Sequence, residues 1–164
     1  MTTNTKAAVD DIAIQLSRLS HQASLCADAL DTAAARATDP QLRALLAHRA
    51  SMQRCAASEL AYRAGPQATA AAATRGRAVR RAEVSPSTDE WQLLQDASHQ
   101  AARAVAGYAV MLRAELTDPA LRPLLVRYYE SSFELQRVLE QRARDVPRPP
   151  PLAAPRRRLR QPSP

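Results

Sequence analysis

Aromatic residues, glycine and cysteine are all scarce in this sequence of 164 residues. Only 4% of the residues are aromatic and only three are glycine, so a hydrophobic core must be aliphatic and closely packed. The two cysteines, Cys26 and Cys55, form no Cys-x-x-Cys pair, so neither a zinc site nor a redox motif is indicated. No apolar run reaches membrane-spanning length, and the N-terminal residues lack the apolar segment of a secretory signal. We therefore expect a cytoplasmic protein with reduced thiols and no transmembrane segment.

The abundant residues, which are alanine, leucine, arginine and glutamine, are good helix formers. Apolar residues recur at alternating spacings of three and four, a pattern typical of helices that bury one face. It predicts an all-α four-helix bundle with helices at residues 7–37, 40–64, 87–116 and 119–145. The apolar stripe of the first helix comprises Val9, Ile12, Leu16, Leu19, Ala23, Cys26, Leu30 and Ala33. That of the second helix includes Met52 and Cys55.

Turn-forming residues mark the ends of these helices. Asp39 can cap the second helix, and Pro40 needs no N–H partner at its first position, so the first two helices must be antiparallel neighbours. Ser87 and Glu90 form a capping box at the start of the third helix. Pro123 falls inside the fourth helix, where it predicts either a kink or a helix that starts at Pro123 itself.

Two segments without helical periodicity carry most of the positive charge. The linker 65–86 contributes +3 and the tail 146–164 contributes five arginines, so the rest of the +7 chain carries about −1. When extended, the linker could reach roughly 70 Å, enough to cross the whole bundle as one long connection. We expect the basic, proline-rich tail to be disordered. The tail could contact nucleic acid or an anionic surface through Arg156, Arg157, Arg158 and Arg160. It lacks the interleaved aromatic residues that would stack on bases.

An internal repeat is the most specific signal in the chain. Residues 38–46 recur at 117–125 with seven of nine positions identical, an offset of 79. Residues 20–23, Ser-His-Gln-Ala, recur at 98–101, an offset of 78. A composition rich in alanine, leucine and arginine does not explain a repeated Thr-Asp-Pro or Ser-His-Gln. We therefore infer two duplicated helical hairpins joined by the long crossover linker.

Four motifs connect the chain to a known family. They are Ala33-Ala34, Thr38-Asp39-Pro40-x-Leu42-Arg43-x-Leu45-Leu46, Ser58-Glu59-Leu60 and Gly107-Tyr108. In these motifs the chain resembles a family of ferritin-like bacterial proteins whose common domain has no known function. The resemblance covers about residues 10–145, and some members of the family are linked to stress responses. The resemblance implies a four-helix bundle and brings no established activity. The family pattern has glutamates where this chain has Ala35 and Met52. Its third helix is rich in acidic residues, whereas residues 96–101 of this chain are Asp-Ala-Ser-His-Gln-Ala. Most of the family's carboxylates are therefore missing from this chain.

A di-iron site in a bundle requires a glutamate from each of two helices and Glu-x-x-His from each of the others. The sequence contains no Glu-x-x-His, and no glutamate in its first helix, so a standard di-iron centre is not expected. His21 and His99 fall off the apolar stripes and should be exposed, with His48 at the rim. Glu59 could be a residual site carboxylate, although pairing with an arginine such as Arg63 is favoured. The weak candidates for metal ligation are Glu59, Asp96, His99, Glu130 and Glu134.

Cys26 and Cys55 lie on antiparallel neighbours, within one turn of each other across the turn at Asp39. Oxidation to a disulfide is conceivable on this spacing, but two buried, reduced cysteines that act as small apolar residues are favoured.

These observations favour a non-catalytic bundle without a cofactor, acting as a scaffold or interaction module for a protein partner or a second copy of the chain. One alternative is a degenerate iron-binding protein that uses acidic residues such as Glu59, Asp96, Glu130 and Glu134. Another is a protein that associates with nucleic acid or an anionic surface through its basic tail.

Overall fold

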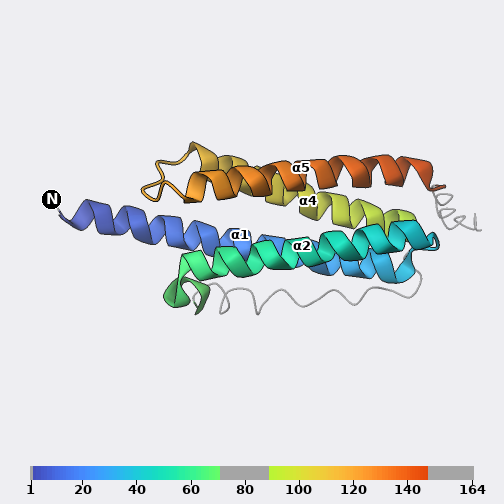
Figure 1. The fold of residues 1–164 in the computed structure, drawn as a ribbon, viewed down its shortest axis with the longest axis horizontal. Helices are drawn as coiled ribbons and strands as arrows, with labels where there is room; N and C mark the ends of the chain where they lie inside the picture. The colour runs from blue at the N-terminus through green and yellow to red at the C-terminus, as the bar shows by residue number, and fades with distance from the viewer. Residues whose placement is uncertain (1, 71–88, 148–164) are drawn as a thin grey trace, which may run out of the picture.

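A computed structural model gives the structure of residues 2–70 and 89–147, with side chains for residues 10–70 and 89–147. Its long elements are helices: α1 (Thr2–Arg36), α2 (Pro40–Ala64), α4 (Glu90–Arg113) and α5 (Leu121–Asp145) (Figure 1). Residues 66–70, which were predicted to begin the linker 65–86, form a short helical segment instead, and the described residues contain no strand. The prediction of an all-α protein is therefore confirmed. The side chain of Val9, the capping residue Ser87, the linker residues 71–86 and the tail arginines lie outside the described residues.

The four long helices form two antiparallel pairs, α1 with α2 and α4 with α5, and the pairs meet where α1 packs against α4 (Figure 1). In the α1–α2 turn, Oγ1 of Thr38 donates to Oε2 of Glu90 at the start of α4 (3.1 Å). At the other end, Nη1 of Arg63 in α2 donates to Oδ2 of Asp118 before α5 (3.1 Å). The end of α2 and the start of α4 therefore lie at opposite ends of the molecule, and the two helices run in the same direction.

Small residues make up much of the buried faces of α1 and α4. They include Ala23, Cys26 and Ala27 on α1 and Ala97, Ala101 and Ala104 on α4. A Cβ atom added to Gly107 would lie 2.6 Å from Cδ2 of Leu19, so glycine at this position permits a close approach of α4 to α1. Large aliphatic side chains from all four helices complete the core, among them Leu30, Leu46, Leu60, Leu94, Leu125, Leu135 and Leu139.

The first copy of the repeated turn forms the helix start that the sequence predicts. The carboxylate of Asp39 accepts a hydrogen bond from the backbone N–H of Gln41 (2.9 Å), and α2 begins with Pro40. The backbone N–H of Arg43 donates to the Asp39 carbonyl (2.9 Å), which is the first helical hydrogen bond.

The second copy starts its helix later. Asp118 accepts from the N–H of Ala120 (2.9 Å) in the same way, but α5 begins at Leu121 rather than at residue 119 as predicted. Pro123 explains the delay, because it has no N–H to donate to the carbonyl of Pro119 four residues earlier. At the third position of α5, Pro123 removes no helical hydrogen bond, since the first N–H groups of any helix lack a partner within it.

The bounds of α1 and α4 also differ from prediction. The backbone of α1 is helical from residue 2 rather than 7 and ends at 36 rather than 37. The N-cap of α4 is Asp89, whose carboxylate accepts from the N–H of Gln92 (2.8 Å), so α4 begins at Glu90 rather than 87. The Glu90 side chain accepts from Thr38 in the neighbouring turn. The predicted capping box depended on Glu90, and this side chain instead accepts the tertiary hydrogen bond from Thr38.

The last turn predicted for the third helix is absent. Ala114 has an extended backbone, so α4 ends at Arg113 rather than at residue 116. The guanidinium of Arg122 in α5 donates to the carbonyls of Leu112 (3.0 Å) and Ala114 (3.5 Å). These carbonyls have a partner outside the helix, which removes the need for a further helical turn.

Residues at equivalent positions of the two repeats meet between the hairpins. Nε2 of Gln22 donates to Oε1 of Gln100, 78 residues later (2.8 Å). Nε2 of Gln53 donates to Oγ of Ser132, 79 residues later (3.5 Å). Because 78 and 79 are the offsets of the repeated segments, the two hairpins face each other about a local two-fold axis that passes close to both pairs.

We predict that the effect of Gly107→Ala on stability changes sign with the residue at position 19. Alanine favours a helix over glycine by about 1 kcal/mol, but overpacking against the buried Leu19 costs roughly 1–3 kcal/mol. Gly107→Ala should therefore lower the free energy of unfolding in the wild-type chain and raise it in a Leu19→Ala background. Urea unfolding of this double-mutant cycle measures both effects, and the same sign in both backgrounds would contradict the close contact.

Candidate functional site

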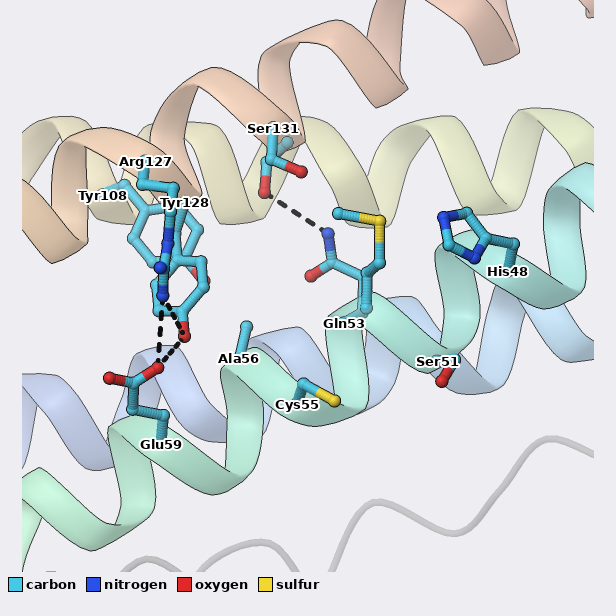
Figure 2. A pocket seen from close by; sticks show the side chains of 12 residues that line it. His48, Ser51, Gln53, Cys55, Ala56, Glu59, Tyr108, Arg127, Tyr128 and Ser131 are labelled. Carbon is cyan, nitrogen blue, oxygen red and sulfur yellow. Dashed lines mark hydrogen bonds and ion pairs between the residues drawn. The ribbon is translucent and has the colours of Figure 1, made fainter.

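A cleft lies between α2 and α5. Among the described residues, close backbone packing joins α1 to α2, α4 to α5 and α1 to α4, with no comparable approach of α2 to α5. The space left between them, which we call the α2–α5 cleft, has a volume of about 400 Å³ (Figure 2). Gln53 and Glu59 on α2, Tyr128 and Ser132 on α5, and Tyr108 on α4 are among the residues that line it. The cleft is therefore built from both repeats and lies beside the local two-fold axis.

Long polar side chains bridge α2 and α5 along this cleft. Nη2 of Arg49 lies 3.4 Å from Oε1 of Glu134, and Nη2 of Arg127 lies 3.4 Å from Oε2 of Glu59. The Arg127–Glu59 pair is exposed, and such pairs contribute at most about 1 kcal/mol, whereas the Arg49 side chain is only 16% exposed. These polar pairs bridge α2 and α5 beside the cleft, while buried leucines of both helices, such as Leu46 and Leu135, belong to the shared apolar core.

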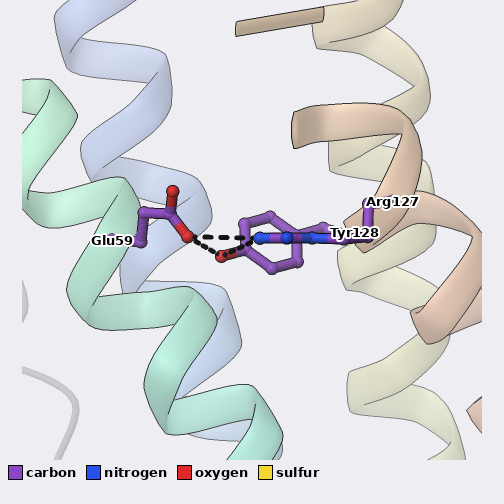
Figure 3. Close-up of polar contacts among 3 residues, drawn as sticks. All are labelled: Glu59, Arg127 and Tyr128. Atoms are coloured by element: carbon purple, nitrogen blue, oxygen red, sulfur yellow. Dashed lines mark hydrogen bonds and ion pairs between the residues drawn. The ribbon is translucent and has the colours of Figure 1, made fainter. Parts of the chain in front are cut away.

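Glu59, Tyr128 and Arg127 form one polar cluster at an end of the cleft (Figure 3). The Tyr128 hydroxyl donates a short hydrogen bond to Oε2 of Glu59. Nη2 of Arg127 lies 3.4 Å from both Oε2 of Glu59 and the Tyr128 hydroxyl, and its guanidinium lies 5.1 Å from the centre of the Tyr128 ring. Glu59 pairs with an arginine, as predicted, but its partner is Arg127 rather than Arg63, because Arg63 pairs with Asp118 at the end of the molecule.

Both tyrosines of the cleft hold their protons more strongly than a tyrosine in water. Burial raises the pKa of Tyr128, and its hydrogen bond to Glu59 raises it further, partly opposed by Arg127. Burial also raises the pKa of Tyr108, with smaller contributions from Tyr128 and Cys26. The rings of Tyr108 and Tyr128 lie 6.1 Å apart. Both hydroxyls therefore remain neutral at physiological pH and can donate hydrogen bonds.

Two buried polar groups that line the cleft have no partner among the described residues. Tyr108 is fully buried, yet its hydroxyl makes no hydrogen bond there. Gln53 is 4% exposed, and its Oε1 is likewise unpaired, while its Nε2 makes only the 3.5 Å bond to Ser132. Buried polar groups in folded proteins nearly always have a partner, so each exception requires an explanation.

The residues proposed as metal ligands do not converge. Asp96 and His99 are exposed on α4, and Glu130 is exposed on α5. Glu134 pairs with Arg49, and Glu59 belongs to the polar cluster of the cleft. Within residues 10–70 and 89–147, no three histidine, cysteine, aspartate or glutamate side chains lie close enough together to hold a metal ion. His21 and His48 are exposed, and His48 lines the cleft.

The predicted apolar stripe of the second helix is partly wrong. Cys26 is buried, but Cys55 is exposed and Met52 is 39% exposed, and both line the cleft. The inward position between them is occupied by Gln53. The reason is that the backbone of α2 lies close to α1 but not to α5, so part of the face of α2 that turns toward α5 remains accessible. The two cysteines are therefore on different faces, and both are free.

Sequence reasoning missed the most buried polar residues of the cleft. Gln53 and Ser132 were overlooked because polar residues were assigned to the surface. The repeat offset of 79 relates one to the other, and this relation could have indicated that they meet on the axis. Tyr108 entered the sequence analysis only in the Gly107-Tyr108 motif. The state of its hydroxyl depends on the packing of all four long helices, which contribute to the apolar cluster around its ring.

Comparison of the chain with protein-family models, with curated proteins and with solved structures finds no match. Across the described ranges 2–70 and 89–147, none of the helices combines the length and apolarity that crossing a membrane would require.

We predict that stability falls as the pH rises above about 9. Burial raises the pKa of Cys26 from 9.0 to about 12, and that of Tyr108 above its ordinary 10.0. The unfolded chain then loses these protons first, so the stabilisation is complete below about pH 9 and is lost as the pH approaches 12. Urea unfolding between pH 8 and 11 should show a shallower fall for Cys26→Ala and for Tyr108→Phe than for the wild type. Equal slopes in all three proteins would contradict the burial of these groups.

We also predict that removing an unpaired polar group of the cleft does not destabilise the protein. Gln53→Leu and Tyr108→Phe should leave the free energy of unfolding unchanged or raise it by up to about 1 kcal/mol, because a buried group without a partner is lost. Ser132→Ala is the matched control. It removes the partner of the Gln53 amide and should cost about 1 kcal/mol. Thermal unfolding distinguishes these outcomes, and a large loss in Tyr108→Phe would show that the hydroxyl is hydrogen-bonded.

Proposed function

We propose that this protein is a non-catalytic interaction module, built as a ferritin-like four-helix bundle of two duplicated hairpins, which recognises its partner through the α2–α5 cleft. The pairing of Gln22 with Gln100 and of Gln53 with Ser132 supports the duplication, since each pair joins equivalent repeat positions. The parallel course of α2 and α4 supports a crossover connection of the kind that ferritin-like bundles have.

The observation that carries this proposal is the contrast between paired charges and unpaired neutral groups in one cleft. Glu59 already accepts hydrogen bonds from Tyr128 and Arg127. The Tyr108 hydroxyl and the Gln53 carbonyl oxygen have no partner among the described residues. Free neutral donors and acceptors favour reversible binding, because a partner can supply the hydrogen bonds that the protein does not.

The same geometry argues against acid–base catalysis by these residues. A general base works best with a pKa near the operating pH. The pKa values of Tyr108 and Tyr128 are raised, away from neutrality, by burial. Glu59 would have to release both of its partners before it could take a proton from a substrate. Recognition therefore accounts for the cleft better than proton transfer does.

Iron binding is the competing function, and the donor set of the described residues does not favour it. A bundle di-iron site needs carboxylates that project inward from several helices. Here no aspartate or glutamate is among the buried residues described on α1 and α4, and Glu59 is the one ligand candidate that lines the cleft. Contact of the tail arginines with nucleic acid or an anionic surface stays a prediction, as do a role under stress and a protein partner or second copy of the chain.

Metal loading tests the proposal. The purified protein is incubated with ferrous iron, desalted and assayed for bound iron and for oxygen consumption, together with Glu59→Gln and the exposed control Glu130→Gln. We expect no stoichiometric iron and no oxygen consumption above buffer in any of them. Iron near one or two ions per chain that is lost in Glu59→Gln and kept in Glu130→Gln would replace the proposed function with the iron-binding alternative.

A further inference from the structure

Three features of the α2–α5 cleft together define what it can hold: its unpaired polar groups, its balanced charge and its apolar wall. We infer that the cleft binds a small neutral molecule of the amide class, one that carries both a hydrogen-bond donor and an acceptor. This inference rests on the proposed function and adds to it the chemistry of the ligand.

The unpaired polar groups call for a donor and an acceptor in the same ligand. Tyr108 and Gln53 come from different helices and different repeats, and both line the cleft while being at least nine-tenths buried. The Gln53 oxygen requires a donor, and the Tyr108 hydroxyl can donate to an acceptor. If the Gln53 amide were turned, its nitrogen would face the cleft instead, and an amide ligand would still supply the matching group.

The charge balance of the cleft excludes a strong preference for ions. The one carboxylate and the one guanidinium that line the cleft, those of Glu59 and Arg127, offset each other. A charged ligand would lose its hydration without gaining an unpaired counter-charge, which is unfavourable. Protonated tyrosine hydroxyls and a glutamine amide add dipoles but no net charge to the wall.

The remaining wall suits a flat apolar body of modest size. Met52 and Ala56 on α2 line the cleft together with Gln53 and Glu59. A thioether packs well against an aromatic ring. One face of the Tyr128 ring is covered by Arg127, so Met52 is the more accessible apolar surface. A volume of about 400 Å³ accommodates a single ring with its amide group.

Three probes of nearly the same shape test this inference, namely benzamide, benzoate and benzamidinium, which are neutral, anionic and cationic. Each is titrated into the full-length protein while the Gln53 side-chain amide and the Met52 methyl group are followed by NMR. We expect benzamide to shift both signals saturably, with a dissociation constant of about 1 mM as befits a fragment, and the charged probes to leave them unchanged. Tyr108→Phe and Gln53→Leu should each weaken benzamide binding about tenfold. Tyr129→Phe, outside the cleft lining, should not.

The outcomes separate this inference from the proposed function. Saturable binding of benzoate or benzamidinium in preference to benzamide overturns the ligand class, while recognition through the cleft stands. Binding of benzamide that Tyr108→Phe and Gln53→Leu leave unchanged also overturns it. If no probe shifts the two signals, and a crystal structure shows ordered water on both Tyr108 and Gln53, solvent satisfies these groups and the inference fails. If the protein instead takes up iron through Glu59, the proposed function fails with it.

Discussion

The close contact of α1 with α4 is the constraint on which the rest of this structure depends. Gly107 leaves room for Leu19, and alanines occupy much of the buried faces of both helices, so the two can approach closely. The outer helices α2 and α5 each pack against one of this central pair but not closely against each other. The close approach of α1 to α4 therefore accompanies a wider spacing of α2 and α5, which leaves the cleft between them.

The α2–α5 cleft is asymmetric, although it lies beside a local two-fold axis. Gln53 and Ser132 mark the local two-fold axis, and the residues to either side of it would be equivalent in a perfect repeat. On one side stand Glu59, Arg127 and Tyr128, and on the other the pair Arg49–Glu134. The cluster of Glu59, Arg127 and Tyr128 therefore lies on one side of the axis and an ion pair on the other, so the two sides are not equivalent.

Periodicity and turn chemistry predict the helices well but not their ends. The Asp-Pro turns occur where expected, yet α5 starts two residues late because Pro123 lacks a donor, and α4 stops early where Arg122 binds its last carbonyls. The candidate site was less predictable. Glu59 was noticed as a carboxylate near the core, but Met52 and Cys55 were assigned to the core and Gln53 was not considered. Helical periodicity identifies the direction in which a side chain points and not how near the next helix lies.

The sequence by itself determined that the chain is helical, where its tight turns fall and that one hairpin motif occurs twice, because each of these depends on residues close together in the chain. The tertiary structure alone decided which faces are covered. The distance between α2 and α5 decides whether Met52 is buried and whether Glu59 meets Arg63 or Arg127. It also decides whether the Tyr108 hydroxyl finds a partner. That distance is set by the packing of α1 on α4, and neither α2 nor α5 encodes it.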